Sequence, residues 1–476
     1  MSFARSSVLP VLAALLSLSG AACVGNHVTG TSATTWTPPA GTDAFLDDLE
    51  RRTVAWFTDY TDRSTGLTAD RAPQAPFCSI ASVGFALTAY PIGAERGYLA
   101  RAEARARVLN TLQWFWQAPQ GPQPDATGYH GFFYHMLDLK TGKRFEQVEL
   151  STIDSSLLFA GMLFDREYFD QADPDEVRIR ALADSIYFRA DWQWFSPRPP
   201  LVAMDWKPEV GYHTADWRGY NEAMILYVLA LGSPTHPIDP AAWNTWTTTY
   251  QWGTYAGQAH VGFAPLFGHQ FSQTWIDFRG IQDAYMRGHG IDYFENSRRA
   301  TLAQQAYAQA NPMKWKDYGD SIWGLTAGDG PADGSYTIDG RARSFFTYSA
   351  RGVDFTEVRD DGTITPEGAG GSMPFAPEIV ITALMAMKAR YGADLYSTYG
   401  FVDGFNPTFT VTPTYGRVVP GKGWFDTQYV GIDQGPLLAM VENYRTGLIW
   451  KYMRKSPYIQ TGLKRAGFTG GWLTTP

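Results

Sequence analysis

The sequence has few of the residues that build disulfide scaffolds and metal sites. It contains only two cysteines, Cys23 and Cys78, in 476 residues, which excludes a disulfide framework. The eight histidines are scattered and no HExxH pattern occurs, so we expect no metal site. A GxSxG elbow, a P-loop and a GxGxxG fingerprint are also missing from the sequence, which excludes α/β-hydrolase and nucleotide chemistry.

Charged residues are also scarce. They make up 18% of the chain, below the roughly 25% of an average soluble domain, and the formal net charge is −8. A nucleic-acid-binding protein would carry clustered Lys and Arg, so nucleic acid is not an expected partner. By contrast, 45% of residues are hydrophobic and 15% are aromatic. This composition predicts a large core, and rings in excess of the needs of a core usually line a cleft.

The N-terminus has the pattern of an export signal. Arg5 precedes an apolar run from Val8 to Leu18, which is too short to span a membrane, and Cys23 follows small residues. Residues 1–22 are therefore predicted to be a signal peptide, with cleavage before an acylated Cys23 and ordinary cleavage after Ala22 equally open. Residues 23–42 are predicted to be a flexible tether. Either form would be exported, to the periplasm or the cell surface, and Cys78 would be a buried thiol or, less expected, a partner of Cys23.

Residues 43–476 are predicted to form one helical domain. Amphipathic segments at Asp43–Tyr60, Tyr98–Trp116 and Asp175–Phe195 indicate solvent-side helices. A second set of segments is apolar on nearly every face, which is typical of buried helices. This set comprises Ser79–Ala94, Leu150–Phe164, Tyr220–Gly232, Pro377–Tyr391 and Asp433–Arg445, and Arg298–Ala310 is a further candidate.

Alternation of these two kinds of helix is typical of an (α/α)6 toroid, in which an outer ring of helices surrounds an inner ring. We therefore predict an all-α fold. Glycine-rich turns between Met313 and Phe375 predict long loops or short hairpins that cap one end. Asp329-Gly330 and Asp360-Asp361-Gly362 are interpreted as turns, with calcium binding a minor alternative.

The buried helices keep their acidic residues at their first turns. Asp154, Glu222, Glu378 and Asp433 all have this position, and parallel inner helices would bring them to one end of the ring. Any one of these acids alone is more simply explained as a helix cap. Several on buried helices favour a site, because a buried carboxylate is costly unless it has a partner. A hollow lined by carboxylates and aromatic rings is typical of glycoside hydrolysis.

Glu222 is the predicted general acid, because Trp217, Tyr220 and the apolar run after it would exclude water and raise its pKa. Asp433 is the preferred base, because the dipole at the start of its helix should keep the carboxyl group ionised, and Asp154 is the alternative base. Further candidate substrate-binding residues combine rings with hydrogen-bonding groups; they are Trp217, Tyr220, Asn221, Glu149, Tyr134, His236, His269, Trp275, Asp277 and Arg279. His236 could instead be structural, and Asp277 with Arg279 could be an ordinary ion pair.

Several of these stretches resemble a known family. ELSTIDSSLLFAGML from Glu149, WRGYNEAMILYVLALGSPTHP from Trp217, FAPLFGHQFSQTWIDFRG from Phe263, YFENSRRA from Tyr293 and IDQGP from Ile432 are similar to the glucoamylase-like domain, and most similar to glycoside hydrolase family 144. The resemblance implies an (α/α)6 toroid, inverting hydrolysis of β-1,2-glucan and no cofactor. It carries an essential acid over to Glu222, and further acids to Asp154 and Asp433. Ser155-Ser156 stands where the family pattern would have Thr-Ala.

Two other functions remain open at this point. A polysaccharide lyase could share the toroid, although it would need a basic cleft and a Tyr/His pair. A non-catalytic glycan-binding lipoprotein would need the aromatic cleft but not the acids. The expected partner is β-1,2-glucan or its oligosaccharides, bound by a monomeric chain that meets a membrane only through a lipid on Cys23.

Overall fold

Helices that are apolar on every face form the centre of the protein. In the computed structural model, the structure describes residues 36–73 and 75–474. The predicted signal peptide, Cys23 and most of the predicted tether lie outside the described residues. Pro38–Pro476 forms one compact unit, to which the following description applies.

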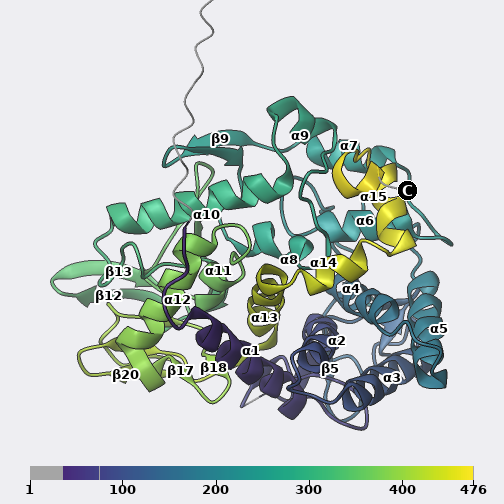
Figure 1. Ribbon diagram of the computed structural model, residues 1–476, viewed down its shortest axis with the longest axis horizontal. Coiled ribbons are helices and arrows are strands. Elements are labelled where there is room, and N and C mark those ends of the chain that lie inside the picture. The colour runs from purple at the N-terminus through teal and green to yellow at the C-terminus, as the bar shows by residue number, and fades with distance from the viewer. Residues whose placement is uncertain (1–35, 74, 475–476) are drawn as a thin grey trace, which may run out of the picture. The chain divides into compact units, whose positions relative to one another are not determined.

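Six central helices contact one another in a closed cycle (Figure 1). They are α2 (Ile80–Glu95), α4 (Thr152–Tyr168), α6 (Met224–Gly232), α8 (Phe267–Trp275), α11 (Pro366–Gly370) and α13 (Gly431–Arg445). Most neighbours in this order pack against each other, and α13 contacts α2 to complete the cycle. α8 and α11 are joined by a hydrogen bond, in which the Gln270 amide donates to Gly368 O at 2.9 Å, and the same amide donates to Ser372 Oγ, just after α11, at 2.9 Å.

A second set of helices packs outside the central ones. It comprises α1 (Thr42–Asp59), α3 (Arg101–Gln117), α5 (Pro174–Arg189), α10 (Tyr293–Ala310), α12 (Pro377–Tyr391) and α15 (Pro457–Arg465). Each of these helices contacts a central helix with its buried side, and α3 and α5 also pack against each other. Shorter helices are α7 (Ala241–Thr247), α9 (Ala284–His289) and α14 (Leu448–Met453), with 3-10 turns at Gly392–Asp394 and Gly471–Thr474. The fold is thus mainly helical, and its helices lie in two layers.

Four of the predicted inner helices are confirmed, and two predictions about the inner layer are wrong. α2, α4 and α13 match the predicted buried segments within a few residues, and α6 begins at Met224 inside the segment predicted from Tyr220 to Gly232. The segment 377–391 is instead an outer helix, because Thr382 and Arg390 face solvent, and α10 also has one exposed side. The positions of central helices are taken by α8 and α11, which are short; α8 contains Gly, Ser and Gln, and α11 contains two Gly residues.

The fold is mainly helical, as predicted, although short strands between the helices are more widespread than the hairpins expected at one end. In chain order they are β1 (Arg71–Ala72), β2 (Phe77–Ser79), β3 (Gly128–Tyr129), β4 (Phe132–Phe133), β5 (Met136–Asp138), β6 (Leu150–Ser151), β7 (Asp205–Lys207), β8 (Gly211–Tyr212), β9 (Trp252–Tyr255), β10 (Gln258–Val261), β11 (Ala327–Asp329), β12 (Gly334–Ile338), β13 (Arg341–Phe345), β14 (Tyr348–Ala350), β15 (Gly352–Val353), β16 (Val358–Arg359), β17 (Tyr396–Ser397), β18 (Gly400–Phe401), β19 (Phe405–Asn406), β20 (Arg417–Val419), β21 (Gly423–Phe425) and β22 (Tyr429–Val430). All their pairings are antiparallel, and no sheet among the described residues exceeds three strands. The hairpins expected between Met313 and Phe375 are present as β11–β16.

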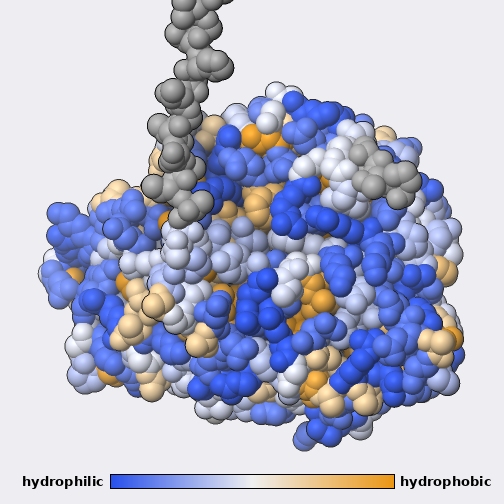
Figure 2. All heavy atoms as spheres, viewed as in Figure 1, coloured by the Kyte–Doolittle hydropathy of each residue, from blue (hydrophilic) through white to orange (hydrophobic). Residues whose placement is uncertain are grey.

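The surface seen in Figure 2 is mostly hydrophilic, with scattered apolar patches. Within the described part of the chain, no helix combines the length and the apolar character that crossing a bilayer requires.

Cys78 is buried and unpaired among the described residues, and burial raises the pKa of its thiol to about 12.

The two central helices with the most extensive contact, α2 and α4, approach closely through glycine. A Cβ on Gly84 would lie 2.4 Å from the carbonyl oxygen of Leu157, and one on Gly161 would lie 2.2 Å from that of Gly84. Both contacts are with backbone, which cannot rotate away. The glycines are therefore required for the distance between these helices.

We predict that Gly84→Ala lowers the free energy of unfolding by about 1–3 kcal/mol, because the added methyl group forces the helices apart. Urea unfolding measures this. Gly288→Ala in α9 is the matched control: no atom lies within 4 Å of its Cβ, and alanine there should change stability by less than about 1 kcal/mol. Equal stability of Gly84→Ala and the wild type would contradict the close packing.

Candidate active site

A cavity of about 420 Å³ lies where the central helices begin. Side chains next to the starts of α2, α4, α6, α8 and α13 line it. They include Ser79, Ile153, Asp154, Leu157, Glu222, Phe267, Phe271, Ile432 and Asp433, and Asp70, Arg71, His135 and Tyr348 complete the wall. The structure thus brings the three predicted catalytic carboxyl groups, from distant parts of the sequence, into one cavity.

Glu222 occupies a turn just before α6 and does not cap that helix. Its position is fixed by Ser272 of α8, whose hydroxyl donates to Glu222 O at 2.7 Å and accepts from Ile225 N at 2.9 Å. Removal of water raises the pKa of the Glu222 carboxyl to about 7, and the charge of Asp154 acts in the same direction. Glu222 can therefore carry a proton at neutral pH.

Asp154 belongs to a chain of charged groups that also contains His135 and Glu149. One carboxylate oxygen accepts from the Ser151 hydroxyl at the start of α4, and the other lies 3.6 Å from His135 Nε2. The opposite ring nitrogen, Nδ1, lies 2.7 Å from Glu149 Oε1. Although burial opposes it, the carboxylates of Asp154, Glu149 and Asp70 raise the pKa of His135 to about 9. The imidazolium in turn lowers the pKa of Glu149 to about 2.

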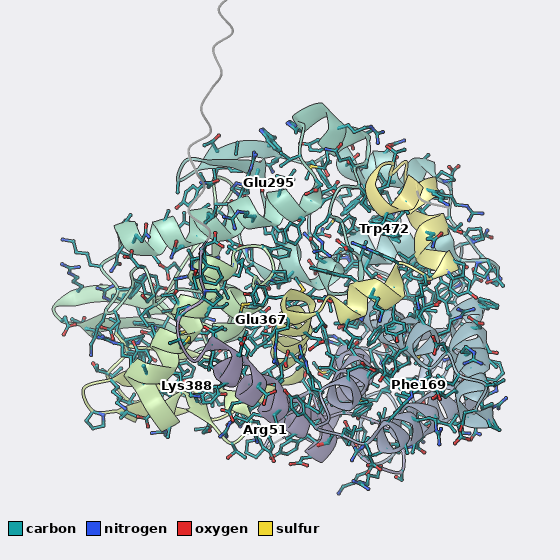
Figure 3. All side chains as sticks on the ribbon, in the orientation of Figure 1. Arg51, Phe169, Glu295, Glu367, Lys388 and Trp472 are labelled. Carbon is teal, nitrogen blue, oxygen red and sulfur yellow. The ribbon has the colours of Figure 1, made fainter. Side chains whose placement is uncertain are left out.

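Asp433 lies in a group of acids, and this group changes its expected charge state. Burial raises the pKa of Asp433 well above its ordinary range, and the carboxylate of Asp403, with which it shares a hydrogen bond, adds to the shift. The expectation that the helix start keeps Asp433 ionised is therefore not met, because desolvation and like charges outweigh the helix dipole. Glu367 of α11, near the middle of the molecule in Figure 3, belongs to the same group, and burial raises its pKa to about 8.

Carboxylate oxygens of Asp329, Asp403 and Asp426 lie within 4.8 Å of one another, a spacing that a metal ion could bridge. Arg71 already offsets part of this charge: its Nη1 lies 2.7 Å from Asp329 Oδ2 and its Nε lies 3.1 Å from Asp70 Oδ2. The pKa of Asp329 is still raised to about 6, first by burial and then by Asp403. These groups can be neutralised by Arg71 and by protons.

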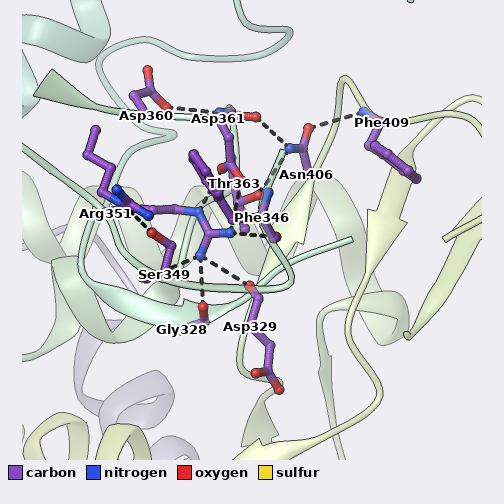
Figure 4. Close-up of polar contacts among 12 residues, drawn as sticks. Gly328, Asp329, Phe346, Ser349, Arg351, Asp360, Asp361, Thr363, Asn406 and Phe409 are labelled. Carbon is purple, nitrogen blue, oxygen red and sulfur yellow. Dashed lines mark hydrogen bonds and ion pairs between the residues drawn. The ribbon is translucent and has the colours of Figure 1, made fainter. Parts of the chain in front are cut away.

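Arg351 fixes the hairpin that carries part of this site (Figure 4). The side chains of Arg351 and Asp361 are both fully buried, and the guanidinium binds that carboxylate through Nε at 2.7 Å and Nη2 at 2.9 Å. Its remaining donors bind backbone oxygens, including Gly328 O at 2.8 Å. Arg351 therefore connects the strand that carries Asp329 to the strand that carries Tyr348. Asp360, by contrast, accepts hydrogen bonds from Tyr307, Trp315 and Tyr318 and has a structural role.

Several predicted substrate-binding residues do not line this cavity. Tyr220 and Asn221 line a neighbouring cavity, and Glu149 lies behind His135. Five others lie in the protein interior and make structural contacts. The ring nitrogens of Trp217 and Trp275 donate to Thr152 Oγ1 and Thr88 Oγ1, respectively. Asp277 forms ion pairs with Arg279 and Arg454, the guanidinium of Arg144 lies over the Tyr134 ring, and a ring nitrogen of His269 lies within hydrogen-bond distance of Phe263 O. Arg279 stacks on Trp450, and His236 follows the C-terminal end of α6, opposite Glu222. Glu378 pairs with Arg298 outside the cavity.

Sequence reasoning missed several residues that the structure brings to the site, including Asp70, Arg71, His135, Asp403 and Tyr348. For His135 the available signal was its place next to Tyr134, a predicted substrate-binding residue. Asp403 and Tyr348 are in strand and loop segments whose pairing depends on contacts between distant parts of the chain. No local pattern distinguishes them.

Comparison with known proteins agrees with this geometry. Residues 214–457, which include Glu222 and Asp433, match the Glycoamylase family model of glucoamylase-type proteins. The chain belongs to this family. A crystal structure of a protein from Bacteroides uniformis, also described as glucoamylase-type, is 30% identical, with a TM-score of 0.78 over 92% of this chain and 100% of that one.

Two characterised relatives act on β-1,2-linked glucose. An endo-β-1,2-glucanase from Chitinophaga pinensis, solved with sophorotriose and glucose, is 27% identical, with a TM-score of 0.77 over 91% of this chain and 99% of that one. An exo β-1,2-glucooligosaccharide sophorohydrolase from Parabacteroides distasonis is 27% identical over 91% of this chain. The present chain spans 59% of the length of that curated relative.

The ion pairs of His135 make a testable prediction about stability. The pKa of His135 is higher in the folded protein, so the stabilisation is complete below about pH 6.5 and is lost as pH rises through about 9. We expect His135→Gln to lower the free energy of unfolding by roughly 1–2 kcal/mol at pH 6, because the ring is partly exposed and solvent weakens the pairs. Urea unfolding at pH 6 and pH 10 should show a difference at the lower pH only.

His289→Gln is the control for this experiment, because that ring is exposed and forms no ion pair among the described residues. A loss of stability in His135→Gln that is the same at pH 6 and pH 10 would show that the imidazolium charge does not contribute.

Proposed function

We propose that this chain is an exported glycoside hydrolase that cleaves β-1,2-glucan within the chain and inverts the configuration at the cleaved carbon. The observation that carries the proposal is a carboxyl group with a pKa near 7, Glu222, in one cavity with the buried acids Asp154 and Asp433. The relatives' activities support the choice of glucan. The two helical layers, with their closed central cycle, support an (α/α)6 toroid.

In this mechanism, Glu222 donates its proton to the oxygen of the departing sugar, and a second carboxyl group takes a proton from the attacking water. We assign the second role to the Asp433–Asp403 pair. Two carboxyl groups that share a hydrogen bond retain one proton and one negative charge between them, so the pair can still accept a proton. Asp154 is the alternative base. Its charge, held beside the His135 imidazolium, also helps to keep Glu222 protonated.

Cleavage within the chain is supported by cavities on both sides of the acids. Arg71 lines the acid-containing cavity and also a cavity of about 800 Å³, and Tyr348 lines the acid-containing cavity and another of about 830 Å³. A long substrate can therefore extend in both directions from Glu222.

We further propose that the protein acts as a monomer without a cofactor, in the periplasm or at the cell surface, anchored through Cys23 if that cysteine is acylated.

Replacing Glu222 tests the assignment of the acid. Glu222→Gln should lower kcat on β-1,2-glucan at least about 100-fold, because the amide cannot donate a proton as an acid, while glucan binding persists. Reducing-end assays and chromatographic sizing of products measure this, and Glu378→Gln outside the cavity is the control. Retained activity in Glu222→Gln would exclude Glu222 as the acid, and unsaturated products from the wild type would identify a lyase instead.

The pH dependence of the wild type gives a separate test. Glu222 must be protonated to act, so kcat should fall as pH rises through about 7. The basic side of the pH–rate profile on β-1,2-glucan reports this pKa. Activity that continues to increase between pH 7 and 9 would contradict the proposed role.

A further inference from the structure

A second cavity of about 830 Å³ adjoins the cavity that holds the acids, and Tyr348 lines both. The segment before α6 also connects them, since Tyr220 and Asn221 line the second cavity and Glu222 lines the first. Any substrate that contacts Glu222 and extends along this segment therefore passes Tyr348.

Tyr348 is an exposed aromatic residue at a fixed position. It is 54% exposed and lies in β14 directly opposite Asp329 of β11, so the two side chains share one face of the hairpin. Arg351 directly follows β14, and its buried pair with Asp361 holds the hairpin in place. Tyr348 also lines the cavity that holds Asp433, so its side chain reaches the cavity of the acids.

The second cavity presents polar side chains that have no protein partner. Arg218, Gln251 and Glu357 line it and are exposed, and within the described residues their side chains form no hydrogen bond or ion pair. Its wall also includes the ring of Phe263. Exposed rings for the C–H face of a sugar, with donors and acceptors for its hydroxyl groups, are what a pyranose chain needs.

We propose that Tyr348 is a stacking platform for glucose units, and that the second cavity binds the continuation of the glucan chain beyond the cleavage point. This inference rests on the proposed function, because it assumes that the chain is a β-1,2-glucan. It goes beyond that function by naming the residues that make long chains bind more tightly than short ones.

Binding measurements in the inactive Glu222→Gln protein test this inference without any turnover. Long β-1,2-glucan and the disaccharide sophorose are titrated calorimetrically into this protein and into the same protein with one further substitution. Tyr348→Ala should weaken glucan binding about tenfold, and Tyr348→Phe less than about twofold because the ring remains. Gln251→Trp, which fills the second cavity, should weaken glucan binding about tenfold more than sophorose binding.

Tyr415→Ala and Val210→Trp are the matched controls, because these residues are 62% and 78% exposed and line neither cavity. If Tyr348→Ala and Gln251→Trp bind glucan as the controls do while Glu222→Gln itself binds it, the inference is wrong and the proposed function stands. If Glu222→Gln binds neither glucan nor sophorose, while the wild type also fails to cleave glucan, the proposed function is wrong and the inference fails with it.

Discussion

The cost of burying several carboxyl groups in one cavity determines how this site is built. Each ionised group taken out of water is unfavourable unless a positive charge or a proton compensates it. Arg71 compensates Asp329 and Asp70, and the His135 imidazolium compensates Asp154 and Glu149. No cation pairs with Glu222 or Asp433 among the described residues, so Glu222 retains a proton and Asp433 shares one with Asp403. The distribution of cations therefore separates the acids into ionised and protonated members, which is what acid–base chemistry requires.

The scaffold meets this requirement by placing side chains from many segments at the starts of the central helices. Glycines at positions 84 and 161 allow α2 and α4 to approach until their backbones are in contact, and Ser272 ties the Glu222 turn to α8. The Arg351–Asp361 pair fixes the hairpin that brings Asp329 and Tyr348 to the opposite wall. Packed helices and one internally bonded hairpin thus position Asp154, Glu222, Asp433, Asp329 and Tyr348.

The sequence predicted the parts of this arrangement that leave a local signal. Helices α2, α4 and α13 are long and apolar on every face, and their first-turn acids indicated Asp154 and Asp433. Helices α8 and α11 could not be predicted, because both are short and the buried Gln and Ser residues of α8 are satisfied only by distant partners, as Gln270 is by Gly368. For the same reason Trp275 and Asp277 looked like ligand-binding residues. Their hydrogen-bond partners, Thr88 and Arg454, are far away in sequence.

The central claim is that Glu222 is protonated at neutral pH because its surroundings exclude water. Difference infrared spectroscopy of the wild type against Glu222→Gln across a pH titration measures this state directly. We predict that a protonated carboxyl signal specific to Glu222 is present at pH 6 and disappears with a midpoint near pH 7. A midpoint near pH 4.5, the value of an unperturbed glutamate, would contradict the account.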